Sequence, residues 1–214
     1  MREPSVDARG TKGGMSHATT RPHLRLVGET DGAPASDAQL VDAARAGAEW
    51  AKEALYRRHS RMANGLSYRL LGSDAELDDL VQDCFVIALT TLDRLAQPAA
   101  FSSWLGGIVV RQAHKRLRRR RMLSRLGLRR AEPVDLDAIV RPGLPPDVAT
   151  ELRRVYSALD ELPPEERIAL VLRRVEGLEL AEVAIRMGLS LATVKRRLER
   201  ADTFLAVRFE RGTP

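Results

Sequence analysis

Between residues 36 and 207, apolar side chains recur at intervals of three and four residues, and no segment shows the two-residue alternation of a β-strand. The clearest case is residues 77–89, where Leu77, Leu80, Val81 and Cys84 fall on one side of a helix. Such a chain folds by packing amphipathic helices together. Aromatic residues make up only 4% of the chain, which favours helices packed through Leu, Val and Ala over a β-sandwich. The sequence therefore predicts an all-α fold.

Breaks in this pattern predict two small helical domains joined by a flexible linker. Residues 1–35 are rich in Gly, Thr, Pro, Ser and Ala, which predicts a disordered leader. The first domain is expected over 36–122 and the second over 147–208. Residues 123–146 hold several Gly and Pro residues and form the predicted linker. These expectations hold whether the chain starts at Met1 or at Met15.

Helix boundaries follow from capping residues and helix breakers. Ser36 is a predicted N-cap, and Ser73 with Glu76 has the spacing of a capping box. Gly and Pro residues end the other helices. The predicted helices span about 36–46, 48–71, 73–95, 101–122, 147–161, 164–175, 179–186 and 191–207.

Composition excludes several classes of protein. The net charge of +6 favours a polyanionic partner. Cys84 is the only cysteine, so it has no disulfide partner, and its apolar neighbours predict a small buried side chain. The N-terminus lacks the apolar core of a signal peptide, and no apolar run approaches the roughly 18 to 20 residues needed to span a bilayer. We therefore expect a soluble, cytoplasmic protein without membrane insertion.

No pattern of residues predicts catalysis. The four histidines show no metal-ligand spacing with one another or with Cys84. No Gly-rich phosphate loop and no nucleophile with its base is present. The sequence predicts no metal, no cofactor, no small-molecule substrate and no enzyme activity.

The strongest functional pattern lies in residues 178–201, which have helix-turn-helix spacing. A short helix is followed by a turn at Gly188, and Ser190 is placed to cap a second, strongly cationic helix. Such a helix can enter the major groove of duplex DNA. The alternative is an amphipathic hairpin whose basic face is only solvated. The candidate DNA-binding residues are Ser190, Thr193, Lys195, Arg196, Arg197 and Arg200.

A basic tract precedes the predicted linker. No Asp or Glu occurs between Arg94 and Ala131, and residues 111–130 carry ten Lys and Arg residues. Like charges at this density repel one another, so a nucleic-acid partner with salt-dependent binding is expected. The alternative is a charged helix end that leads into the linker. The tract alone does not distinguish DNA from RNA.

An acidic face is predicted on the helix that contains residues 77–89. Most such faces are the solvated side of an amphipathic helix. This one is too acidic to approach DNA, so any partner would be a protein. Its members are Asp78, Asp79, Gln82 and Asp83.

Together these segments resemble the bacterial sigma factors of RNA polymerase, in the small two-domain extracytoplasmic-function subfamily. LDDLVQDCF (77–85) resembles their polymerase-binding helix, and FSSWLGGIVVRQAHKRLRRRR (101–121) resembles their promoter-melting helix. Residues 162–201 resemble their C-terminal promoter-binding domain. The resemblance covers about residues 36–208, with the parts in the family's order.

The resemblance implies a role for each group of residues. The acidic face would dock on core RNA polymerase, and residues 190–200 would bind the −35 element of promoter DNA as duplex. An anti-sigma factor would be a further partner. The −10 element would be held during melting by Arg111, His114, Lys115, Arg118 and Arg119.

The chain departs from the family pattern at two positions. Arg111 stands where Asn is frequent, and Ala48 stands where Asp is frequent. A guanidinium at position 111 favours phosphate or guanine over the contacts of an amide. Two other functions stay open: an autonomous helix-turn-helix regulator that binds DNA without polymerase, and a basic RNA-binding protein.

Overall fold

The computed structural model describes residues 35–72, 76–128 and 145–210. Every regular element in these ranges is helical, which confirms the all-α prediction. The leader predicted at 1–35, except Ala35, lies outside the described residues. So do Ser73 of the predicted capping box and residues 129–144 of the predicted linker.

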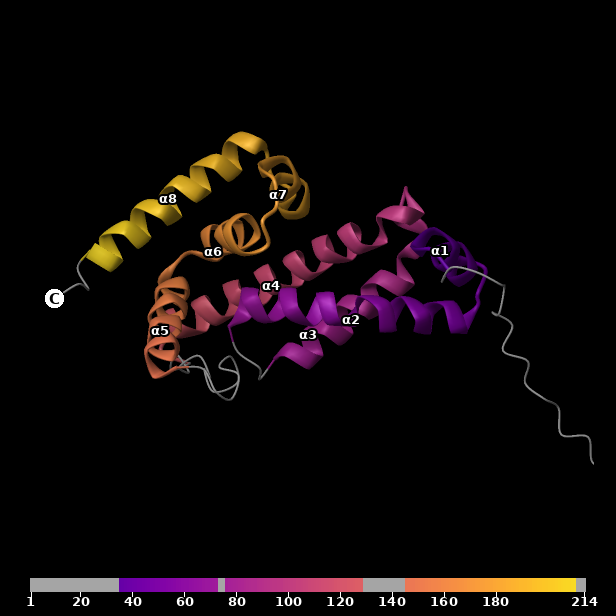
Figure 1. The fold of residues 1–214 in the computed structure, drawn as a ribbon, viewed down its shortest axis with the longest axis horizontal. Coiled ribbons are helices and arrows are strands. Elements are labelled where there is room, and N and C mark those ends of the chain that lie inside the picture. Colours follow the sequence, from indigo (N-terminus) through magenta and orange to yellow (C-terminus); the bar gives the residue numbers. More distant parts are fainter. Residues whose placement is uncertain (1–34, 73–75, 129–144, 211–214) are drawn as a thin grey trace, which may run out of the picture. The chain divides into compact units, whose positions relative to one another are not determined.

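Four α-helices and two short 3₁₀ turns make up the first half of the chain (Figure 1). They are α1 (Asp37–Arg45), α2 (Glu49–Leu71), α3 (Leu77–Thr90), η1 (Leu92–Arg94), η2 (Pro98–Ala100) and α4 (Phe101–Arg125).

Local sequence explains where these helices begin and end. Ser36 is the N-cap of α1, as predicted, and it also forms a capping box with Gln39, which was not predicted. Gly72 ends α2 in the left-handed region, at φ 69°, which glycine adopts without strain. Glu76 does not cap α3 through its side chain, since its carboxylate binds Arg120 instead.

The predicted apolar stripes form the core. Leu40, Leu55 and Leu80 are all 2% exposed or less, and Cys84 is fully buried beside them. Trp104 is half-buried and packs against Phe101, whose ring centroid is 6.1 Å from its own.

Helix α4 is buried on more than one side. Residues 105–110 are all buried, since α4 contacts α2 and α3 as well as α6 and α7 of the second half. The approach is close at Gly106, where a Cβ would lie 2.6 Å from Nη1 of Arg186, the flexible end of that side chain. A helix that is apolar around its circumference is enclosed. The helix pattern predicted two separate domains, and this contact between the halves was not predicted.

The second half consists of α5 (Pro146–Glu161), α6 (Pro164–Leu170), the π-helical turn η3 (Val171–Val175), α7 (Leu180–Met187) and α8 (Leu191–Glu210). One helix was predicted over 164–175, but α6 ends at Leu170. The N–H of Glu176 reaches back five residues to the carbonyl of Val171 at 3.0 Å, which widens the last turn. None of the described helices is both long enough and apolar enough to cross a membrane.

Candidate nucleic-acid interface

Helices α7 and α8 form the predicted helix-turn-helix. Gly188 takes φ 65° in the turn between them, and the N–H of Leu189 donates to the carbonyl of Ala184 at 3.0 Å. Ser190 caps α8, accepting from the N–H of Thr193 at 3.2 Å. Val194 and Leu198 are buried, so α8 turns its opposite face outward.

The six candidate residues on α8 fall into two groups. Ser190, Lys195 and Arg196 are exposed. Thr193 is half-buried beside the Ser190 hydroxyl, whereas Arg197 places Nη1 3.4 Å from Oε1 of Glu166. Arg200 is exposed and lies 4.0 Å from the same oxygen. The α8 cations that face outward without an acidic partner in the described ranges are therefore Lys195 and Arg196.

The candidate residues of α4 also differ in exposure and in whether they have an acidic partner. Arg111, Lys115, Arg118 and Arg119 are exposed. His114 is half-buried, and its Nε2 lies 3.1 Å from Oε1 of Glu165 on α6. Burial raises the pKa of Glu165, but its backbone hydrogen bond and His114 outweigh this and hold the pKa below its ordinary value. One of the five −10 candidates thus binds an acid of the second half.

The adjacent residues Glu165 and Glu166 therefore bind candidate residues of both α4 and α8. Glu165 contacts His114 of α4, and Glu166 contacts Arg197 of α8. Neither acid could be predicted from the local sequence, because the pairs are separated by 51 and 31 residues along the chain.

Two arginines of the basic tract are structural. Arg116 binds Asp83 at 2.6 Å and the carbonyl of Glu76 at 2.7 Å. Arg120 binds the carboxylate of Glu76 at 3.3 Å. These bonds tie α4 to the start of α3, so this part of the tract does not need a polyanion to balance its charge.

The acidic face lies on the outer side of α3. Asp78, Asp79, Gln82 and Asp83 are all exposed, as their positions predicted. One turn further on, Val86 is 55% exposed on the same face, a feature that the sequence analysis did not use. An apolar side chain beside carboxylates suits a protein partner better than a nucleic acid.

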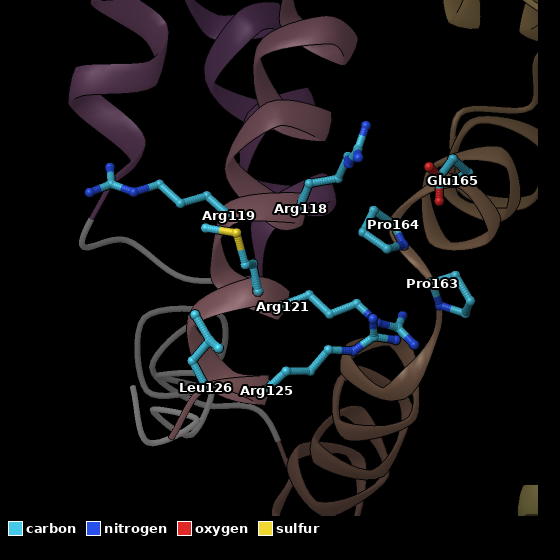
Figure 2. A pocket seen from close by; sticks show the side chains of 9 residues that line it. Arg118, Arg119, Arg121, Arg125, Leu126, Pro163, Pro164 and Glu165 are labelled. Carbon is cyan, nitrogen blue, oxygen red and sulfur yellow. The ribbon is translucent and has the colours of Figure 1, made fainter. Parts of the chain in front are cut away.

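A cavity of about 790 Å³ opens between the end of α4 and the start of α6 (Figure 2). One wall is cationic and is formed by Arg118, Arg119, Arg121 and Arg125, while Pro163, Pro164 and Glu165 form the other. The described residues contain no group of three or more side chains of the kinds that bind metals in an arrangement that could hold an ion.

Two family models match the chain. One is described as "Sigma-70 region 2" and matches residues 55–122, and the other as "Sigma-70, region 4" and matches residues 152–202. The first match contains the acidic face and α4, and the second contains the helix-turn-helix.

Similar proteins are found over most of the chain. SigM of Mycobacterium tuberculosis, described as an ECF RNA polymerase sigma factor, is 34% identical over 172 residues, covering 80% of this chain and 83% of the relative. The ECF RNA polymerase sigma-E factor of Escherichia coli is 30% identical over 173 residues, covering 78% and 90% of the two chains.

Solved structures share the fold. CnrH in complex with the cytosolic domain of CnrY matches with a TM-score of 0.57 and 29% identity, covering 83% of this chain and 99% of that chain. The sigma factor RpoE of Bartonella quintana, in complex with the anti-sigma factor NepR, matches with a TM-score of 0.54 at 20% identity, covering 72% and 94%.

Proposed function

The chain belongs to the extracytoplasmic-function family of RNA polymerase sigma factors, and from this premise we propose how its residues divide the work of promoter recognition. Its function is promoter recognition in association with RNA polymerase, for transcription initiation. An autonomous regulator is not favoured, because the similarity to sigma factors extends over 80% of the chain and includes the first half.

One observation carries the assignment of roles: a single chain presents an acidic face and two separate cationic faces. The exposed carboxylates of α3, with Val86 beside them, are suited to a protein surface. They dock on core polymerase, whereas the exposed cations of α4 hold the −10 element and those of α8 hold the −35 element. We further propose that the chain has no catalytic activity of its own.

The contacts between the two halves imply that the factor changes conformation when it binds a promoter. The −10 and −35 elements are about 25 base pairs apart, or roughly 85 Å at about 3.4 Å per base pair. In the structure, His114 of α4 and Arg197 of α8 bind neighbouring glutamates at 3.1 and 3.4 Å. The two helices cannot reach both elements from this arrangement, so the halves separate when the factor joins polymerase and DNA.

An anti-sigma factor is a further proposed partner. The similar structure of CnrH is a complex with the cytosolic domain of CnrY. The acidic face of α3 is open to solvent and available to a protein that competes with polymerase. Co-purification from cells under resting and inducing conditions tests this proposal, and recovery of polymerase alone under both conditions would contradict it.

In vitro transcription with purified core polymerase tests the main proposal. We expect promoter-dependent transcripts from core plus this chain and none from either component alone. Asp79→Asn removes a charge from the proposed docking face, and Asp147→Asn removes one from an exposed position of α5. Loss of one good charge contact, worth about 1.4 kcal/mol, weakens core binding about tenfold for the first variant. Equal effects of both variants would contradict the docking role.

A further inference from the structure

The cations of α4 differ in whether the protein itself neutralises them. Arg116 and Arg120 bind Asp83 and Glu76, as described above. Arg118, Arg119, Arg121 and Arg125 have no hydrogen-bonding or ionic partner within the part of the chain that the structure describes. All four of these unpaired arginines line the cavity between α4 and α6.

Two of these side chains converge. Figure 2 shows Arg121 and Arg125 extending from α4 toward Pro163, whereas Arg118 points upward, past Pro164, and Arg119 points to the opposite side. Arg121 and Arg125 are four residues apart on one helix, where like charges destabilise the helix. Nη1 of Arg121 is also buried without a hydrogen-bond acceptor. A buried, unsatisfied guanidinium N–H is costly, and an anion bound beside Arg121 and Arg125 would both accept from it and relieve the repulsion between the two charges.

Glu165, the acidic residue in the cavity wall, does not neutralise Arg121 and Arg125. The carboxylate of Glu165 is held by His114 at 3.1 Å. The position of the cavity at the end of α4 accounts for the presence of some cations there, since cations near a helix C-terminus are favourable. It does not account for the unsatisfied Nη1 of Arg121 or for the convergence of two guanidinium groups.

We propose that this cavity binds a small molecule that carries a diphosphate or triphosphate group, held by Arg121 and Arg125. A guanidinium group can donate two parallel N–H bonds to two oxygens of a phosphate. Two guanidinium groups that point into the same cavity are therefore suited to a ligand with more than one phosphate. The volume of about 790 Å³ lies within the range of small-ligand sites, about 300 to 1,000 Å³. The same volume is too small to enclose duplex DNA, whose major groove alone is about 12 Å wide.

Binding of inorganic tripolyphosphate to the full chain, measured by calorimetry without magnesium at constant ionic strength, tests this site. We expect saturable binding with one ligand per chain. Arg121→Gln with Arg125→Gln weakens it at least tenfold. The control, Arg61→Gln with Arg94→Gln, removes the same charge from two exposed arginines outside the cavity and changes it less than twofold.

Several results would overturn the proposal. They are an absence of saturable binding, equal weakening in both double variants, and a cavity variant that weakens duplex DNA binding while tripolyphosphate binding is unchanged. The last result would assign these arginines to the DNA backbone.

A second pair of variants tests the site if the glutamine variant fails to fold. Arg121→Lys with Arg125→Lys keeps the charge and removes the paired donors. An unchanged affinity in that variant would also contradict the site. Transcription with core polymerase is measured separately, so the promoter function is tested independently.

Discussion

At the scale of the residue, burial lowers the reactivity of the Cys84 thiol. Burial raises the pKa of its thiol to about 12, although the nearby charge of Arg116 acts in the opposite direction. Because the thiolate is the reactive form, the folded protein should not react with a disulfide reagent at pH 8. We expect no labelling within an hour in buffer and one label per chain in denaturant. Rapid stoichiometric labelling of the native protein would show that the helix packing around Cys84 opens readily.

Asp37 makes the stability of the first half depend on pH. Burial raises its pKa, but hydrogen bonds from Arg58 and His59 outweigh burial and leave the pKa below the ordinary value of 3.8. A carboxylate with a lowered pKa stabilises the fold above pH 3.8, and this contribution is lost as the pH falls through the folded-state value. Chemical unfolding from pH 6 to pH 2.5 should therefore show a smaller acid-dependent loss in Asp37→Asn than in the wild type. Asp42→Asn, on the same helix, is the matched control and should keep the wild-type slope.

Arg196 and Arg197 are adjacent cations with different surroundings. Arg196 is exposed, whereas Arg197 is half-buried beside Glu166. If the −35 assignment holds, Arg196→Ala should weaken holoenzyme binding to promoter DNA and reduce the dependence of log affinity on log salt by about one. Arg197→Ala should lower the free energy of unfolding as well, because the buried Glu166 then keeps only its longer, 4.0 Å contact with Arg200. Comparable loss of DNA binding with no change in stability for both variants would contradict this distinction.

At the scale of the element, Ser190 has two separable roles in α8. Its hydroxyl caps the helix, so Ser190→Ala should lower the free energy of unfolding by about 1 kcal/mol. Ser190→Asp keeps a capping oxygen and adds a negative charge where the phosphates of DNA are expected. The aspartate variant should therefore remain near wild-type stability, measured by chemical unfolding, while losing −35 binding, measured by gel shift of the holoenzyme. Normal DNA binding by the aspartate variant would remove Ser190 from the interface.

The sequence predicted those features of the elements that depend on neighbouring residues. The capping roles of Ser36 and Ser190 and the turn at Gly188 depend on residues within a few positions of each other, and all were predicted. The acidic face was predicted for the same reason. The π-helical turn at 171–175 was not, because its hydrogen bonds compete closely with those of an α-helix.

Contacts between segments that are distant in the sequence could not be predicted. Nothing in the local sequence pairs Arg116 with Asp83, or His114 with Glu165, because only the tertiary fold brings these side chains together. One signal was present and unused: LGGIVV (105–110) is apolar around the whole helix, which predicts burial on both sides of α4.

At the scale of the whole molecule, the contact between the halves should oppose DNA binding by the free chain. Glu165→Gln with Glu166→Gln weakens the bonds to His114 and Arg197. We expect this variant to bind nonspecific duplex DNA several-fold more tightly than the wild type, measured by fluorescence anisotropy. Asp147→Asn with Glu151→Gln removes the same charge from exposed positions of α5 that do not contact α4 or α8, and so corrects for net charge. Equal gains in both variants would show that the contact does not restrain DNA binding.

The adjacent glutamates of α6 also affect where the free factor resides in a cell. A chromosome offers about 10⁶ to 10⁹ nonspecific sites, and a basic protein with open cationic helices would be sequestered on them. By occupying one side chain of α4 and two of α8, Glu165 and Glu166 reduce that loss. We therefore expect newly made copies to stay in the pool that encounters polymerase, so that the number of holoenzymes follows the rate of synthesis instead of the amount of bulk DNA.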